Sequence, residues 1–279
     1  MGLELRPIDR TNANQLWDII FDNPVRHCFV ASKLEQFARV GYAHRTTDIV
    51  GAFRDNNLES ALLFGANLVP VQATQEALDL FASTLARQGR RCSSIVGPAF
   101  EVMELWNRVR GAWQTAREIR TNQPVLATSS RSSLIADEQV RYSTSADLDV
   151  LFPACVEMFT HEVGISPTAT DGGASYRHRI NELIGTRRSF IRTDDEQIVF
   201  KTEVGCVGAS VAQLQGVWVS PDHRGIGIGQ HALASVVRYV LDDIAPIVSL
   251  YANDYNKSAI AMYEKVGFKH IDSFATVLF

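Results

Sequence analysis

The stretch VWVSPDHRGIGIGQ, residues 217–230, decides the fold. Gly225, Gly227 and Gly229 alternate between a predicted strand and a predicted helix. Glycine lets the backbone turn so that successive amides point inward, and the start of a helix adds the positive end of its dipole. The pattern is therefore typical of a turn that binds an anion through main-chain amides, and Arg224 would add positive charge beside it.

The sequence around this turn predicts alternating strands and helices. Val, Ile, Phe and Trp enrich the strand candidates, and apolar residues recur every three to four positions in the helix candidates. Gly267 stands where a left-handed cap would end the second of these helices. The predicted elements are a strand pair at 197–204 and 211–219, a helix from about Gly229, a strand at 246–252, a helix at 256–266 and one or two strands within 268–279.

The first half of the chain repeats this organisation, which indicates a duplicated α/β (α+β) fold. Extended segments at 3–8 and 138–143 each precede helical stretches, and helices predicted at 74–88 and 99–110 correspond to those of the second half. Each copy therefore has a β-α-β-α-β rear half. The segment ATSSRSSLIADE, 127–138, reads as a solvated connection, which places the domains at 1–130 and 138–279.

Composition narrows the classes of function. The 279 residues suffice for two domains, and 46% apolar with 21% charged residues predicts a folded, soluble chain. The net charge of −4 lacks the basic character of a nucleic-acid binder, and no apolar run approaches the ~20 residues that span a bilayer. The N-terminus lacks the order of a signal peptide, and the four isolated cysteines fit a reducing cytoplasm. We expect no nucleic-acid or membrane partner and, since no metal-ligand spacing occurs, no metal.

Two common phosphate-binding turns do not fit the glycine stretch. A Rossmann turn needs GxGxxG and an acid ending the next strand, but the spacing here is GxGxG and residues 246–252 contain no acid. A P-loop needs Gly-Lys followed by Ser or Thr, which is missing. The order strand, glycine turn, helix, strand, Asn256 and finally YEKVGF at 263–268 instead resembles the GCN5-related N-acetyltransferase (GNAT) family.

The resemblance covers about 138–279 and is strongest over 211–268. It implies two tandem GNAT-like domains, each a mixed, mostly antiparallel sheet flanked by helices. The domain at 138–279 would be catalytic, and the domain at 1–130 a degenerate relative, as in tandem actinobacterial acetyltransferases. Because VPVQAT at 69–74 has no glycine and carries a proline, we expect no cofactor loop in the first domain and one cofactor site per chain.

The resemblance also implies a site for acetyl-CoA. The strand backbone at 217–219 would run along pantetheine, amides of the turn would hold the diphosphate, and Asn256 would bind the pantetheine arm. The strands ending at Val219 and near Ala252 would splay apart to admit the thioester. The implied binding residues are Val217, Trp218, Val219, Arg224, Gly225, Ile226, Gly227, Ile228, Gly229, Gln230 and Asn256.

The candidate catalytic groups are Tyr263 and Glu203. Tyr263 follows Asn256 by two helical turns, and by analogy with the family it is the general acid for the thiolate. Gln213 and Gln215 stand on the strand before the turn, where many relatives carry a glutamate, and glutamine cannot take a proton. Glu203 on the preceding strand is the substitute base. The chief alternatives to it are His161 and Glu162 at the end of a helix, and water.

Several residues also have a purely structural interpretation. Asn256 would serve as a plain helix N-cap, Tyr263 as a core tyrosine and Glu203 as a solvated strand residue. We expect Trp218 in the core and His223 on the surface, facing solvent. Residues 166–175 read as a lid or a linker.

The sequence therefore predicts acetyl transfer from acetyl-CoA to a primary amine of a small molecule or a peptide. Two alternatives stay open: a non-catalytic acyl-CoA sensor, and an enzyme similar to mycothiol synthase. The identity of the acceptor and the oligomeric state, a homodimer included, are left open.

Overall fold

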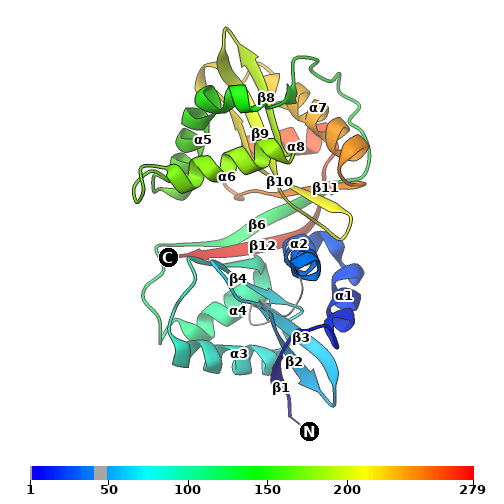
Figure 1. Ribbon diagram of the computed structural model, residues 1–279, viewed down its shortest axis with the longest axis vertical. Helices are drawn as coiled ribbons and strands as arrows, with labels where there is room; N and C mark the ends of the chain where they lie inside the picture. The colour runs from blue at the N-terminus through cyan, green and yellow to red at the C-terminus, as the bar shows by residue number, and fades with distance from the viewer. Residues whose placement is uncertain (1, 41–48) are drawn as a thin grey trace. The chain divides into compact units, whose positions relative to one another are not determined.

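The computed structural model describes residues 2–40 and 49–279, which divide into two compact units (Figure 1). The first unit comprises the chain up to Leu126 together with Tyr251–Asn256 and His270–Phe279. The second comprises Ala127–Leu250 and Lys257–Lys269. Within the described residues, no helix is long and apolar enough to cross a membrane.

The sheet of the first unit has the strand order β1-β2-β3-β4-β5-β12-β6. Its neighbours from β1 to β4 pair antiparallel, β4 and β5 pair parallel, and β12 pairs antiparallel with β5. The elements are β1 (Glu4–Pro7), α1 (Ala13–Asp22), α2 (Pro24–Val40), β2 (Ile49–Arg54), β3 (Asn57–Leu63), β4 (Asn67–Val71), α3 (Gln75–Gln88), β5 (Ser94–Pro98), α4 (Ala99–Val109), β6 (Glu118–Thr128) and, from the end of the chain, β12 (Lys269–Leu278).

The second half of the chain repeats this order of elements. Its sheet runs β11-β10-β9-β8-β7, with antiparallel pairs throughout except for the parallel pair β10–β11. The elements are β7 (Arg141–Tyr142), α5 (Leu148–Val163), α6 (Ala174–Gly185), β8 (Ser189–Asp194), β9 (Gln197–Gly208), β10 (Val211–Val219), α7 (Ile228–Asp243), β11 (Ile247–Tyr251) and α8 (Lys257–Val266).

The repeated order confirms the prediction of two α/β copies, each with a mixed, mostly antiparallel sheet flanked by helices. One element differs in its placement. The prediction left 268–279 with the second domain as one or two strands, whereas the structure has the single strand β12, which lies between β5 and β6 of the first unit. Ala275 and Val277 of β12 are buried in the core of that unit. Alternation along a strand indicates which face is buried but not which sheet buries it.

Helices cover both faces of the sheet in the second unit (Figure 1). On one face α5 and α6 pack on Ile191 and Ile198 of the sheet, with Trp218 at the edge of this cluster. Because Trp218 pairs with Lys201 across β10 and β9, the side chain of Lys201 belongs to the same face. The other face is covered by α7. Because Gly229 of α7 has no side chain, Met262 of α8 and Val219 of β10 can pack closely against the backbone of α7.

Candidate functional site

The parallel pair β10–β11 opens towards its carboxyl end. The two strands pair only from Val211 opposite Ile247 to Gln213 opposite Ser249, although β10 continues to Val219 and β11 to Tyr251. Among the described residues, no strand pairs with β10 after Gln213 on its β11 side. This is the predicted splay, and it leaves the strand edge at Val217 and Trp218 open to main-chain hydrogen bonds.

A bulge interrupts β10 just before this edge. The step from Gln215 to Trp218 on β10 faces the shorter step from Glu203 to Lys201 on β9, so β10 carries one extra residue. Gly216 adopts a φ of 60°, which favours glycine. A Cβ there would lie 2.8 Å from Lys201 Nζ and 3.0 Å from Met158 Cε. The bulge thus brings the backbone of β10 directly against a buried ammonium group.

The glycine turn joins β10 to α7 and presents free amides. Gly225 and Gly227 have φ values of 78° and 91°, and Gly227 precedes the first residue of α7 without a side-chain cap. Among the hydrogen bonds of the described residues, none has an amide from 225 to 230 as its donor. The first amides of a helix lack partners within that helix and favour anions. The turn therefore fits a phosphate group, as the sequence predicts.

The three glycines act in different ways. An added Cβ at Gly225 would meet nothing within 4 Å, so that position is open to an approaching ligand. An added Cβ at Gly229 would lie 2.8 Å from Met262 Sδ and 3.1 Å from Val219 Cγ2, so this glycine is required for packing. The main chain of Ile226 and Ile228 completes the turn, and the Ile226 side chain is exposed.

Arg224 and His223 precede the glycines of the turn and lie in different surroundings. Arg224 is exposed, and its Nε donates a hydrogen bond to the carbonyl of Val219 at 3.0 Å, which closes the turn across its base. His223 was expected on the surface, facing solvent. It lies in the short 3-10 turn Pro221–His223 and is half-buried, and its Nδ1 is enclosed without a partner among the described residues.

The proposed acid, Tyr263, lies on α8, which begins directly after Asn256. Tyr263 is only 6% exposed, and burial, reinforced by the charge of Glu162, raises the pKa of its phenol above the ordinary value. The phenol therefore stays protonated at neutral pH. Glu162 lies in the last turn of α5.

Glu203 lies in a hydrogen-bonded network on the face of the sheet covered by α5. Its Oε2 accepts a hydrogen bond from Lys201 Nζ at 3.3 Å, and its Oε1 accepts one from Gln215 Nε2 at 2.9 Å. Glu203 is 7% exposed, so the solvated-strand interpretation does not hold. Lys201 was missed by sequence reasoning, because a single Lys in an apolar strand gives no signal of its partners. In the part of the chain that the structure describes, no hydrogen bond joins Glu203 to Tyr263, although Glu162 acts electrostatically on both Tyr263 and Lys201.

The corresponding turn of the first unit is closed by the protein itself. Ala73, after β4, donates its amide to Glu101 Oε2 at 3.1 Å, and Thr74 caps α3 by accepting from the amide of Ala77 at 3.3 Å. Glu101 is buried, which raises the pKa of its carboxyl group. The amides that a phosphate would need are thus bound to side chains, which supports one cofactor site per chain.

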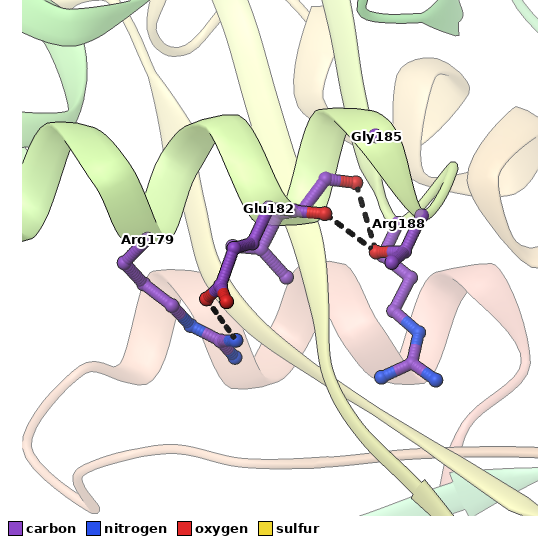
Figure 2. Close-up of a pocket in the computed structure, with 6 residues that line it drawn as sticks. Arg179, Glu182, Gly185 and Arg188 are labelled. Atoms are coloured by element: carbon purple, nitrogen blue, oxygen red, sulfur yellow. Dashed lines mark hydrogen bonds and ion pairs between the residues drawn. The ribbon is translucent and has the colours of Figure 1, made fainter.

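A shallow pocket of about 350 Å³ lies at the end of α6 (Figure 2). Its charged residues partly satisfy one another, since Arg179 pairs with Glu182 at 3.7 Å. None of the predicted site residues lines it. Among the described residues, no group of three or more His, Cys, Asp or Glu side chains gathers to hold a metal ion, and the four cysteines are buried and free.

Comparison with known proteins agrees with this geometry. Residues 157–268 match the family model "Acetyltransferase (GNAT) family", and residues 47–151 match a domain of unknown function, DUF4081. The chain is 29% identical over 103 residues to peptidyl-lysine N-acetyltransferase YjaB of Escherichia coli. It is 36% identical over 59 residues to an uncharacterized N-acetyltransferase of Methanocaldococcus jannaschii. The matches cover 34% and 21% of this chain and 62% and 26% of those relatives.

The whole fold has solved counterparts. A tandem GNAT protein from the clavulanic acid biosynthesis pathway superposes with a TM-score of 0.54 at 13% identity, covering 99% of this chain and 98% of that one. At this identity the likeness concerns the fold alone. The match to the family model shows that residues 157–268 of this chain form a GNAT acetyltransferase domain.

Proposed function

We propose that the second unit binds acetyl-CoA and transfers its acetyl group to a primary amine of a small molecule or a peptide. The observation that carries this proposal is the adjacency of two features on one strand. The open edge of β10 leads directly into a turn whose amides from 225 to 230 donate to no acceptor within the described part of the chain. An extended arm ending in a diphosphate matches both features, because the strand edge supplies alternating donors and acceptors and the turn supplies convergent amides.

Different residues of the site bind different parts of acetyl-CoA. Val217, Trp218 and Val219 bind the extended arm through their backbone, and Asn256 binds it from the start of α8. The diphosphate lies over the amides from Gly225 to Gln230, where the missing Cβ atoms of Gly225 and Gly227 permit close approach. Acetyl-CoA, when bound, supplies the thioester whose carbonyl carbon the amine attacks.

The reaction needs two proton transfers, one from the amine and one to the leaving sulfur. The acceptor must attack as a neutral amine, so Glu203 takes the proton that the nitrogen loses when the N–C bond forms. Tyr263 donates its phenolic proton to the sulfur when the C–S bond breaks. The raised pKa of Tyr263 keeps that proton in place at neutral pH. The printed name of the E. coli relative supports an amine acceptor, since it describes a peptidyl-lysine acetyltransferase.

The first test separates binding from turnover. Calorimetry with acetyl-CoA should show saturable binding to the full chain, and thiol release should depend on an added amine from a panel of lysine peptides, small amines and a sugar–cysteine amine. Gly227→Asp should weaken acetyl-CoA binding by more than about 100-fold, because it blocks the approach and repels the phosphates. Gly111→Asp is the matched control, since an added Cβ at this exposed glycine meets nothing within 4 Å. Equal loss in both variants, or no binding by the wild type, would contradict the proposal.

A sensor that binds acyl-CoA without turnover is the second candidate. The presence of Gln213 and Gln215 on β10, neither of which can take a proton, favours it. Tight acetyl-CoA binding with no thiol release for any amine of the panel would select the sensor. Release with the sugar–cysteine amine alone would select the mycothiol-synthase-like reaction.

A further inference from the structure

Lys201 is a buried ammonium group at the centre of the sheet. It is 1% exposed and lies on β9, paired with Trp218 of β10 on one side and Ile191 of β8 on the other. Burial alone would lower the pKa of Lys201, but Glu203, Cys155 and Glu162 favour the charged form, and the net shift is upward. The side chain is therefore a cation at neutral pH.

The groups that face this ammonium come from three elements. Glu203 of β9 accepts its hydrogen bond at 3.3 Å, while Cys155 and Glu162 of α5 act on it electrostatically. Burial raises the pKa of the Cys155 thiol to about 11. Burial, with the charges nearby, also raises the pKa of Tyr176 on α6, whose hydroxyl donates to the carbonyl of Cys155 at 3.2 Å. Both groups are neutral at pH 7, so Glu203 is the hydrogen-bonded counter-charge of Lys201.

Gln215 completes a clamp on the same carboxylate. Its amide donates to Glu203 Oε1 at 2.9 Å, and its side chain lies over Gly205, where an added Cβ would come within 2.3 Å of it. Each carboxylate oxygen of Glu203 thus accepts one hydrogen bond from a side chain held by neighbouring strands. A carboxylate has about four lone-pair positions, so each oxygen keeps capacity for a further proton donor.

The clamp lies beside the bulge of β10. A Cβ at Gly216 would lie 2.8 Å from Lys201 Nζ and 3.7 Å from Glu203 Cδ. The ion pair is therefore held next to the point where β10 leaves regular pairing and begins its open edge. Burying such a pair costs desolvation that apolar side chains of similar volume would avoid, so stability alone does not account for it.

We propose that Lys201 is a positioning residue for the transfer reaction: its ammonium group holds the carboxylate of Glu203 beside the bulge, so that Glu203 can accept the proton of the attacking amine. The inference rests on the proposed acetyl transfer and adds a residue that acts only through Glu203. One proton moves from the amine nitrogen to Glu203, and Lys201 keeps its own three protons throughout. Gln215 holds the second oxygen and restricts rotation of the carboxylate.

The test is a mutant cycle read by steady-state kinetics. Glu203→Gln should lower kcat/KM by about 100-fold, as expected for loss of a general base. Lys201→Met should lower it by about 10-fold at pH 7, through kcat rather than KM, because the carboxylate of Glu203 loses one of the two donors that hold it. The affinity for acetyl-CoA, measured by calorimetry, should change by less than about twofold. Lys269→Met, at an exposed lysine of β12, is the control and should match the wild type.

The double variant keeps the inference testable if Lys201→Met alone fails to fold. Lys201→Met with Glu203→Gln removes both charges, which avoids an unpaired buried carboxylate. If Lys201 acts through Glu203, the double variant should turn over as fast as Glu203→Gln alone. A further loss in the double variant, or a kcat of Lys201→Met that equals that of the wild type, would overturn the inference. A wild type that binds acetyl-CoA but releases no thiol would instead refute the proposed function, and this inference with it.

Discussion

The surroundings of Tyr263 raise the pKa of its phenol. An exposed phenol and a buried phenol are both neutral at pH 7, but burial and the nearby charge of Glu162 raise the pKa of Tyr263 further. The phenol is therefore protonated at pH 7, as a general acid must be before the departing thiolate forms. Its edge-on contact with Phe268, with ring centroids 6.2 Å apart, holds the ring in place.

We expect Tyr263→Phe to lower kcat by about 10- to 100-fold while leaving the affinity for acetyl-CoA within about threefold of wild type. The ring and its packing remain, and only the proton donor is lost. Tyr239→Phe is the matched control, because it removes a half-buried hydroxyl from α7 that donates to the carbonyl of Val140. Steady-state thiol release and calorimetry check both numbers, and unchanged turnover would remove Tyr263 from the mechanism.

Helix α2 buries an imidazole in the first unit. His27 is 3% exposed, and its Nδ1 has no hydrogen-bond partner among the described residues. Burial, with the positive charge of Arg26, lowers the pKa of His27 to about 4, while Asp272 opposes the shift. Arg26 itself pairs with Asp272 at 2.6 Å, so that negative charge is largely satisfied elsewhere. The helix therefore packs around a neutral histidine.

This burial makes the stability of α2 depend on pH. The unfolded chain binds a proton at His27 near pH 6.5, whereas the folded chain binds it only near pH 4. The stability that depends on a neutral His27 is therefore fully present above about pH 6.5 and is lost as the pH falls towards 4. His27→Gln stays neutral, so wild type should lose about 2 kcal/mol more unfolding free energy than this variant between pH 7 and pH 4.5. Urea unfolding at both pH values measures it, and parallel losses would contradict the assignment.

The last strand of the chain belongs to the sheet of the first unit. The element order of the second half ends with β12, but this strand lies between β5 and β6 in the sheet of the first unit. It pairs with β5 from Phe274 opposite Pro98 to Leu278 opposite Ser94. In the same unit, Thr276 Oγ1 donates to Gln123 Oε1 at 2.6 Å. Neither half of the sequence therefore contains a complete set of strands for the first unit.

Removal of 1–130 should leave an insoluble or inactive fragment. Residues 131–279 would expose the buried face of β12 and both of its hydrogen-bonding edges, which favours aggregation. Co-expression of 1–130 with 131–279 is the matched control, since it supplies the same residues with one cut in the connecting segment. It should restore soluble protein in size-exclusion chromatography. A soluble and fully active 131–279 fragment would contradict this account.

The sequence alone was enough to predict those features that depend on residues close together in the chain. Apolar periodicity located α7 and α8 within one or two residues, and the glycine spacing predicted a turn that the φ values of Gly225 and Gly227 bear out. Trp218 does pack against a buried cluster, and the splay of β10 from β11 matches the resemblance. These features follow from local backbone preference and from side chains a few positions apart.

The rest depended on contacts between distant parts of the chain. Lys201 becomes the partner of Glu203, and Gln215 its clamp, only because two bulges bring β9 and β10 into a particular register. The sheet that receives β12 could not be predicted, since an amphipathic strand suits any sheet with a vacant edge. Local patterns specify which face of an element is apolar, whereas the choice of partner is a competition among non-local packings that no short stretch of sequence records.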